Sequence, residues 1–121
     1  MNDIIKNLIN LLDSKKAEDI VAIDVKNSTT IADYVIVVTA NSNVHAGSLG
    51  RYIIDFFLDS DYKDFIYKKN VEFNNPWILI DAKDVIVHIF QKQEREFYSI
   101  EKLYSKGTVI CNLNKILRIK I

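Results

Sequence analysis

The sequence predicts a single α/β domain in which helices flank a small mixed β-sheet. Three segments carry apolar residues at helical spacing, and they are interspersed with runs rich in valine and isoleucine, which are typical of strands. The chain has 121 residues, of which 49% are apolar and 26% are charged. This length and composition are typical of one globular domain, here residues 1–121.

The chain is expected to begin with a helix from Asn2 to Ser14, because its isoleucines and leucines recur at helical spacing. The alternating residues of Asp19–Lys26 predict a strand with two different faces. The run Tyr34–Ala40 is apolar almost throughout, so we expect a central strand that is covered on both faces.

A second helix is expected to follow Asn41–Asn43 and to end near Leu58. The residues Asn41–Asn43 are types that cap helix N-termini. Gly47 and Gly50 lie three apart inside this helix, where glycine is unfavourable, so we expect them to face a closely packed backbone. A helix that begins just after a strand is also a weak candidate for an anion site, but the sequence has no phosphate-binding fingerprint.

The segment Trp77–Phe90 predicts a β-hairpin, because two apolar runs flank the polar turn Asp81–Asp84. With Ala82-Lys83 as the loop, Trp77 would face His88, whereas a three-residue loop would pair the faces differently. Side chains alternate along a strand, so one face is purely apolar and the other is typical of a docking surface. The apolar face holds Ile78, Ile80, Val85, Val87 and Ile89; the other holds Trp77, Leu79, Asp81, Asp84, Ile86, His88 and Phe90.

The remaining elements are expected on both sides of this hairpin. Asn70–Phe73 is expected to form a short edge strand before it. A helix over Gln93–Tyr104 is expected to follow it and to end at Gly107. Thr108–Ile121 alternates like a strand, but Lys115-Ile116 breaks the alternation, which leaves either two short strands or one with a bulge. The residues of the last helix expected to point inward are Phe97, Ile100, Leu103 and Tyr104.

The composition limits the classes of partner and the cellular location. Sixteen basic residues balance sixteen acidic ones, which argues against broad nucleic-acid binding, and we expect no direct sequence-specific contact either. The start of the chain is unlike a signal sequence. No apolar run approaches the roughly 18 residues that cross a bilayer. We therefore expect a cytoplasmic protein, with Cys111 as a small buried hydrophobic residue.

No metal site is expected. His45 and His88 have no histidine or cysteine neighbours of the kind that zinc sites use, and His45 is expected at the surface. His88 is either a half-buried histidine with satisfied hydrogen bonds or a contact to a partner. Asp81 and Asp84 could together hold a metal, but acids also favour turns, which is the interpretation we prefer.

No catalytic site is expected. Gly47-Ser48 resembles the glycine-serine element of nucleotidyltransferases, which also need an Asp-x-Asp pair on the following strand to hold magnesium. The only such sequence here, Asp59-Ser60-Asp61, falls at the end of the second helix. Carboxylates outside the sheet cannot form that magnesium site, so we expect no catalysis by this route.

Two further features favour a protein interface. Arg95, Tyr98 and Glu101 are spaced three apart, which is either a solvated face with an ion pair or the composition of an interface. The only tryptophan, Trp77, stands at the start of the hairpin, where it is equally consistent with an interface anchor and with a core residue.

These residues together resemble the ribosomal silencing factor family (RsfS, also called Iojap). The resemblance covers roughly residues 4–104 and leaves residues 105–121 as an additional C-terminal segment. The first family signature is matched by Asp33-Tyr34, Thr39, Ser42 and His45. The second and more specific one is matched by Trp77, Leu79, Asp81, Asp84-Val85, Val87-His88, Phe90, Arg95, Tyr98, Glu101 and Leu103.

The resemblance implies a nucleotidyltransferase-like sheet without the catalytic acids, with no enzyme activity and no cofactor. It implies binding to the fourteenth protein of the large ribosomal subunit, on the subunit-joining face. There the factor would block the small subunit sterically and lower translation when nutrients are scarce. Family members are often dimers, which leaves a homodimer open. The residues expected to bind the partner are Trp77, Leu79, Asp81, His88, Phe90, Arg95 and Tyr98.

The alternative function is that of a divergent nucleotidyltransferase or nucleotide-binding protein. It would use the helix start at Ser42 together with Asp81 and Asp84. Magnesium-dependent nucleotide binding would distinguish this alternative from the silencing factor.

Overall fold

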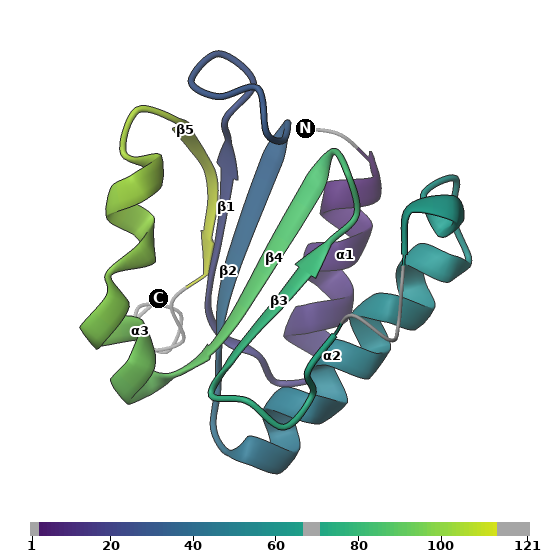
Figure 1. The fold of residues 1–121 in the computed structure, drawn as a ribbon, viewed down its shortest axis with the longest axis vertical. Coiled ribbons are helices and arrows are strands. Elements are labelled where there is room, and N and C mark those ends of the chain that lie inside the picture. The colour runs from purple at the N-terminus through teal and green to yellow at the C-terminus, as the bar shows by residue number, and fades with distance from the viewer. Residues whose placement is uncertain (1–2, 67–70, 114–121) are drawn as a thin grey trace.

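The computed structural model describes residues 3–66 and 71–113 and confirms the mixed α/β fold class. Five strands form one sheet in the order β3-β4-β2-β1-β5, in which β2 and β4 are parallel and the other neighbours antiparallel. Helices α1 and α2 lie behind the sheet in Figure 1, and α3 lies in front of it. The elements are α1 (Asp3–Ser14), β1 (Glu18–Asp24), β2 (Tyr34–Ala40), α2 (Asn43–Leu58), η1 (Lys63–Phe65), β3 (Trp77–Asp81), β4 (Val85–Gln91), α3 (Lys92–Tyr98), η3 (Ile100–Tyr104) and β5 (Thr108–Leu113).

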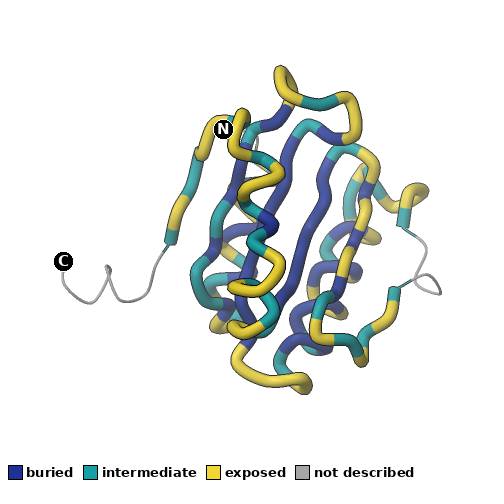
Figure 2. The backbone as a smooth tube through the Cα atoms, turned by 60° about the vertical axis from the view of Figure 1, so that its left-hand side comes forward, coloured by how far each residue is buried: buried dark blue, intermediate teal, exposed yellow. Residues whose placement is uncertain are grey.

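Strand β2 lies at the centre of the sheet, as its unbroken apolar sequence predicts. All seven of its residues are buried, and Figure 2 shows the central strands in dark blue. A strand with neighbours on both edges and cover on both faces excludes water from every side chain, so alternation with polar residues is absent.

The sheet has an apolar core on each face. The larger core lies between the sheet and helices α1 and α2, and it includes Leu8, Ile36 and Val87. The smaller core lies on the opposite face, where Ile100 of η3 packs against the strands. This smaller core consists of Ile23, Val25, Ala32, Val35, Val37, Ile86, Phe90 and Ile100, with Val21, Trp77 and Tyr104 packed against it.

The hairpin forms, but the predicted pairing was wrong by two residues. Trp77 pairs with Phe90, and Leu79 pairs with His88. The loop is displaced by one residue, because the Ala82 N–H donates to the Val85 carbonyl at 2.8 Å and Lys83 takes a positive φ of 68°. A shift of two residues preserves the alternation, so the predicted division of the hairpin residues between the two faces of the sheet is confirmed. That the second face docks a partner stays a prediction.

The predicted edge strand over Asn70–Phe73 was wrong for its described part, because residues 71–73 form no strand. The segment nevertheless packs on α2 at the two glycines. A Cβ atom on Gly47 would lie 3.4 Å from the Phe73 carbonyl oxygen, and one on Gly50 would lie 3.2 Å from the Phe73 ring. Of the two, only Gly50 is tightly packed, against the side chain of Phe73. At Gly47 the backbone contact is an ordinary van der Waals distance, and the nearest atom, at 3.3 Å, belongs to the flexible Arg51 side chain.

The single helix predicted over Gln93–Tyr104 was wrong, because the chain breaks at Ser99. Ser99 adopts a left-handed conformation with φ 48° and separates α3 from the 3-10 helix η3. The break turns Phe97 and Leu103 outward, so that they are 79% and 75% exposed, while Ile100 remains buried as predicted.

Gly107 follows η3 but does not take the left-handed conformation expected of a C′ glycine. Its role is close packing against β1, because a Cβ atom there would lie 2.8 Å from the Asp24 carbonyl oxygen. Strand β5 then pairs with β1 through Leu113. The expected interruption at Lys115-Ile116 and the expected helix start at Asn2 lie outside the described residues.

Candidate functional site

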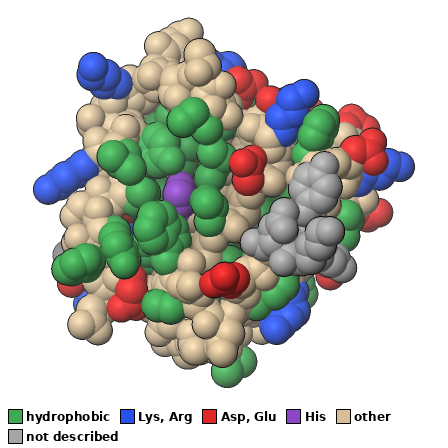
Figure 3. All heavy atoms as spheres, viewed as in Figure 1, with side chains coloured by type: hydrophobic (Ala, Val, Ile, Leu, Met, Phe, Trp, Pro, Cys, Tyr) green, Lys and Arg blue, Asp and Glu red, His purple; other side chains and the backbone are tan. Residues whose placement is uncertain are grey.

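Aromatic and apolar side chains gather on the face of the sheet that α3 and η3 only partly cover. Figure 3 shows them as a continuous hydrophobic area around a histidine, on the face seen in Figure 1. The strands β3 and β4 supply one part of this area, and α3 and η3 supply the other. We call this area the aromatic surface, and it consists of Trp77, Leu79, His88, Phe90, Tyr98 and Tyr104.

Trp77 is the centre of the aromatic surface. Its ring stacks on Phe90 with a centroid distance of 5.1 Å, and its distance from Tyr98 is 4.9 Å. Its indole N–H donates to Nδ1 of His88 at 3.1 Å. Trp77 is half-buried and packs against the smaller core, so it is partly a core residue. Its role as an interface anchor stays a prediction.

His88 lies below Trp77 with both ring nitrogens paired. Nδ1 accepts the hydrogen bond from the indole N–H, so in the neutral ring Nε2 carries the hydrogen and donates to the Tyr104 hydroxyl oxygen at 3.2 Å. Burial lowers the pKa of His88 to about 4, which keeps the ring neutral at pH 7. This arrangement is the buried, hydrogen-bonded histidine that the sequence offered as one of two possibilities.

The predicted partner-binding residues lie at different depths in this site. Leu79 and Tyr98 are each 49% exposed, so a partner can reach them directly. Phe90 and His88 are buried beneath Trp77 and support it from below. The assignment of all these residues to partner binding remains a prediction.

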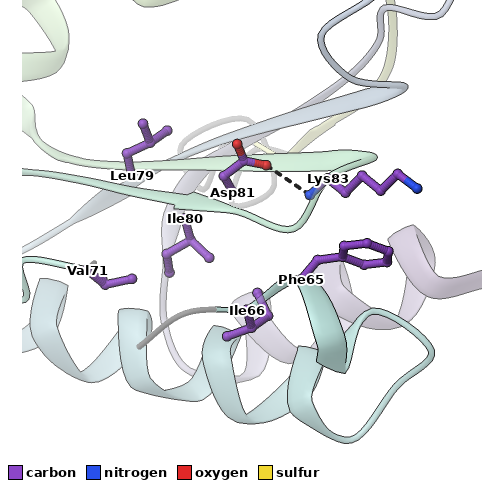
Figure 4. A pocket seen from close by; sticks show the side chains of 7 residues that line it. All are labelled: Phe65, Ile66, Val71, Leu79, Ile80, Asp81 and Lys83. Carbon is purple, nitrogen blue, oxygen red and sulfur yellow. Dashed lines mark hydrogen bonds between the residues drawn. The ribbon is translucent and has the colours of Figure 1, made fainter. Parts of the chain in front are cut away.

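Asp81 is exposed and belongs to the hairpin turn. Its Oδ1 accepts a hydrogen bond from the Lys83 N–H at 2.9 Å, which is the turn-forming role preferred from the sequence. Asp81 and Leu79 also line a cavity of about 380 Å³ beside β3, opposite Phe65 and Ile66 (Figure 4).

Arg95 lies deeper than an exposed interface arginine would. Its Nη1 donates to the Asp19 carbonyl oxygen at 2.7 Å and to the Thr39 hydroxyl at 2.9 Å. Its Nε donates to the Glu101 carboxylate at 2.8 Å, which confirms an ion pair at the predicted spacing but across the break at Ser99. The guanidinium group therefore connects α3 to β1, β2 and η3.

The sequence did not reveal the partners of Arg95 and His88. Asp19 and Thr39 lie 76 and 56 residues from Arg95, and only the sheet order brings the three together. Tyr104 was expected to point inward, but nothing in the sequence connected its hydroxyl to His88.

The sequence predicted His45 at the surface, but its ring does not lie free there. Its Nδ1 accepts from the Asn41 N–H and its Nε2 donates to the Lys15 carbonyl, so it bridges two loops.

The acids considered for a metal or catalytic site are not brought together on the sheet. Asp59 is the C-cap of α2, and Asp61 follows it in a turn, as predicted. Within residues 3–66 and 71–113, no group of three or more histidine, cysteine, aspartate or glutamate residues is placed to hold a metal ion. In the same part of the chain, no helix has the length and apolar character that crossing a membrane requires.

The chain matches the family model described as "Ribosomal silencing factor during starvation" over residues 1–120. It is 38% identical over 93 residues to the ribosomal silencing factor RsfS of Bacillus subtilis, covering 76% of each protein. It is 32% identical over 96 residues to the chloroplastic protein Iojap of Zea mays, covering 78% of this chain and 40% of that protein.

The fold is likewise similar to solved structures. A crystal structure of a Chromobacterium violaceum protein has a TM-score of 0.75 and 28% identity, covering 87% of this chain and 88% of that one. A crystal structure from Bacillus halodurans has a TM-score of 0.67 and 30% identity, covering 84% and 92%.

Proposed function

This chain belongs to the ribosomal silencing factor family, and on that basis we propose that it represses translation by binding the large ribosomal subunit. The partner is the fourteenth protein of that subunit, on the face that joins the small subunit. Occupying this face excludes the small subunit sterically, so the factor acts in the cytoplasm without turnover, cofactor or metal. The name of a mouse relative that is 24% identical over 99 residues, "Mitochondrial assembly of ribosomal large subunit protein 1", supports this choice of subunit.

The observation that carries the proposal is the half-exposed aromatic surface. Tyrosine and tryptophan are enriched among interface residues whose truncation costs most binding energy. Tyr98 and Leu79 are accessible, and Trp77 is held by stacking on Phe90 and by its hydrogen bond to His88. A rigid apolar anchor loses little conformational entropy on binding, which favours affinity.

The nucleotide-binding alternative has less support from the described residues. Asp81 is engaged in the hairpin turn, and Asp59 and Asp61 lie at the end of α2 rather than on the sheet. The Ser42 side chain caps α2 by accepting the His45 N–H at 3.0 Å, so its oxygen already has a local partner.

Co-sedimentation with separated ribosomal subunits tests the proposal, and two tyrosines give a matched comparison. Tyr98 on the aromatic surface is 49% exposed, and Tyr52 on α2, which covers the other face of the sheet, is 41% exposed. The wild type should sediment with large subunits and not with small ones. Tyr98→Ala should weaken this binding by about 30-fold, because truncating a central interface residue costs about 2 kcal/mol.

Tyr52→Ala should bind like the wild type. Thermal unfolding of both variants shows whether either loss reflects unfolding. Equal sedimentation with both subunits, or equal binding by the two tyrosine variants, would contradict the proposal.

A further inference from the structure

Arg95 is more enclosed than its sequence position suggests. Its side chain is 13% exposed, although α3 lies at the surface and none of its residues is fully buried. Three hydrogen bonds hold its guanidinium group, with acceptors on β1, β2 and η3. A charged group of this kind is stable away from water when its donors are satisfied in this way.

Two unusual backbone conformations place the acceptors of Arg95. Asp19 has a φ of 47° at an irregularity in the β1–β2 pairing between Glu18 and Val21. Asp19 is outside the ladders of β1 with β2 and β5, and its carbonyl oxygen accepts from Arg95 instead. Ser99 has a φ of 48° and turns the chain so that Glu101 returns to Arg95.

A positive φ is unfavourable for residues other than glycine, so surrounding contacts must hold it. The hydrogen bond from Arg95 to the Asp19 carbonyl is such a contact at the first position. At the second, the ion pair of Arg95 with Glu101 closes the chain across Ser99. Tyr98 lies between Arg95 and the break at Ser99, with its ring 4.9 Å from Trp77. The position of Tyr98 over Trp77 therefore depends on how α3 and η3 are fixed to the sheet.

We propose that Arg95 is a positioning residue that holds α3 and η3 on the sheet and so keeps Tyr98 over Trp77, without itself touching the partner. Only the effect on binding rests on the function proposed above, because the arrangement of the rings can be measured without any partner. The planar guanidinium reaches acceptors in separate directions, whereas a lysine ammonium is a point charge and cannot replace all three contacts.

The fluorescence of Trp77, the only tryptophan of the chain, tests this positioning role directly. Arg95→Gln should change the emission of Trp77 and increase its quenching by acrylamide, because Tyr98 no longer covers it. Binding to large subunits should weaken about tenfold, the factor expected when the competent arrangement is populated about one tenth of the time. Far-ultraviolet circular dichroism, recorded well below the unfolding transition, shows that the variant is folded.

Three further variants complete the test. Glu101→Gln keeps an oxygen that can accept the Nε hydrogen bond, so it should retain most of the wild-type quenching behaviour. Thr39→Val removes a single acceptor and should give a smaller change in the same direction, even if Arg95→Gln fails to fold. Arg51→Gln is the control, because Arg51 is an exposed arginine of α2 that lies over Phe73 and should affect neither measurement.

The outcomes separate the two proposals. Unchanged Trp77 fluorescence in folded Arg95→Gln would overturn the positioning role, and together with lost binding it would make Arg95 a direct partner contact. Changed fluorescence, with a wild type that does not bind large subunits, would leave the positioning role standing and reject the proposed function.

Discussion

At the scale of single residues, His88 shows how a polar side chain can lie inside an apolar site. Its two ring nitrogens have one donor and one acceptor as partners, Trp77 and Tyr104, so burial leaves no ring atom unsatisfied. The same two bonds fix which nitrogen carries the proton. A second proton would have to occupy Nδ1, where it would displace the hydrogen bond from Trp77.

Acidification should therefore destabilise the protein through His88. The pKa of His88 is about 4 in the folded state, below the ordinary 6.5. Between pH 6.5 and pH 4, His88 is therefore protonated in the unfolded chain but neutral in the folded one. The contribution of the neutral His88 ring to the free energy of unfolding is fully present above pH 6.5. It falls by about 3 kcal/mol as the pH is lowered to 4. The free energy of unfolding, measured by urea at several pH values, should show this loss.

The variant His88→Leu isolates this contribution, because it keeps the carboxylates that titrate in the same range. The difference in unfolding free energy between wild type and variant should shrink by about 3 kcal/mol from pH 7 to pH 4. Parallel pH profiles for the two proteins would show that His88 does not titrate as its burial requires.

The residues of the aromatic surface were largely predictable from the sequence, but their contacts were not. Strict alternation placed Trp77, Leu79 and His88 on one face, and this held even though the predicted register was wrong by two residues. The network of Arg95 joins residues far apart in sequence, so no local pattern could indicate it.

At the scale of elements, the break between α3 and η3 marks the limit of periodicity as evidence. No glycine or proline interrupts Gln93–Tyr104, so the sequence favours one continuous helix. Tertiary contacts of Arg95 with Glu101 and of Tyr104 with His88 instead accompany a left-handed Ser99. The hairpin and the central strand were predictable from local patterns. A strand buried on one face alternates apolar and polar residues, and a strand buried on both faces is apolar throughout.

Gly107 should tolerate a side chain much less well than Gly47. A Cβ atom at Gly107 would lie 2.6 Å from Ile23 and 2.8 Å from the Asp24 carbonyl, which belongs to the sheet and cannot move freely. Gly107→Ala should therefore destabilise the protein by about 1–3 kcal/mol, as overpacking does. Urea unfolding measures the change.

Gly47→Ala is the matched control. Its nearest neighbour, at 3.3 Å, is the flexible end of Arg51, and alanine favours the helix by about 1 kcal/mol. We expect Gly47→Ala to be neutral or stabilising. An equal loss of stability in both variants would show that Gly107 is no more tightly packed than Gly47.

At the scale of the whole molecule, the two faces of the sheet differ in their cover. Helices α1 and α2 close one face over the larger core, whereas α3 and η3 close only part of the other (Figure 1). The aromatic surface lies where the uncovered strands meet the tyrosines of α3 and η3 (Figure 3). The larger core lies under the closed face, and the open face is the one to which the proposed function assigns partner binding.

Ribosomal subunit joining tests this account most directly. Purified subunits are mixed with increasing amounts of the protein, and joined ribosomes are measured by sedimentation. The account predicts that joining falls in proportion to the added protein and is fully suppressed near an equimolar ratio to large subunits. Tyr98→Ala should need a much higher concentration, and Tyr52→Ala should match the wild type. Complete inhibition far below the equimolar ratio, or equal inhibition by both variants, would contradict occlusion through the aromatic surface.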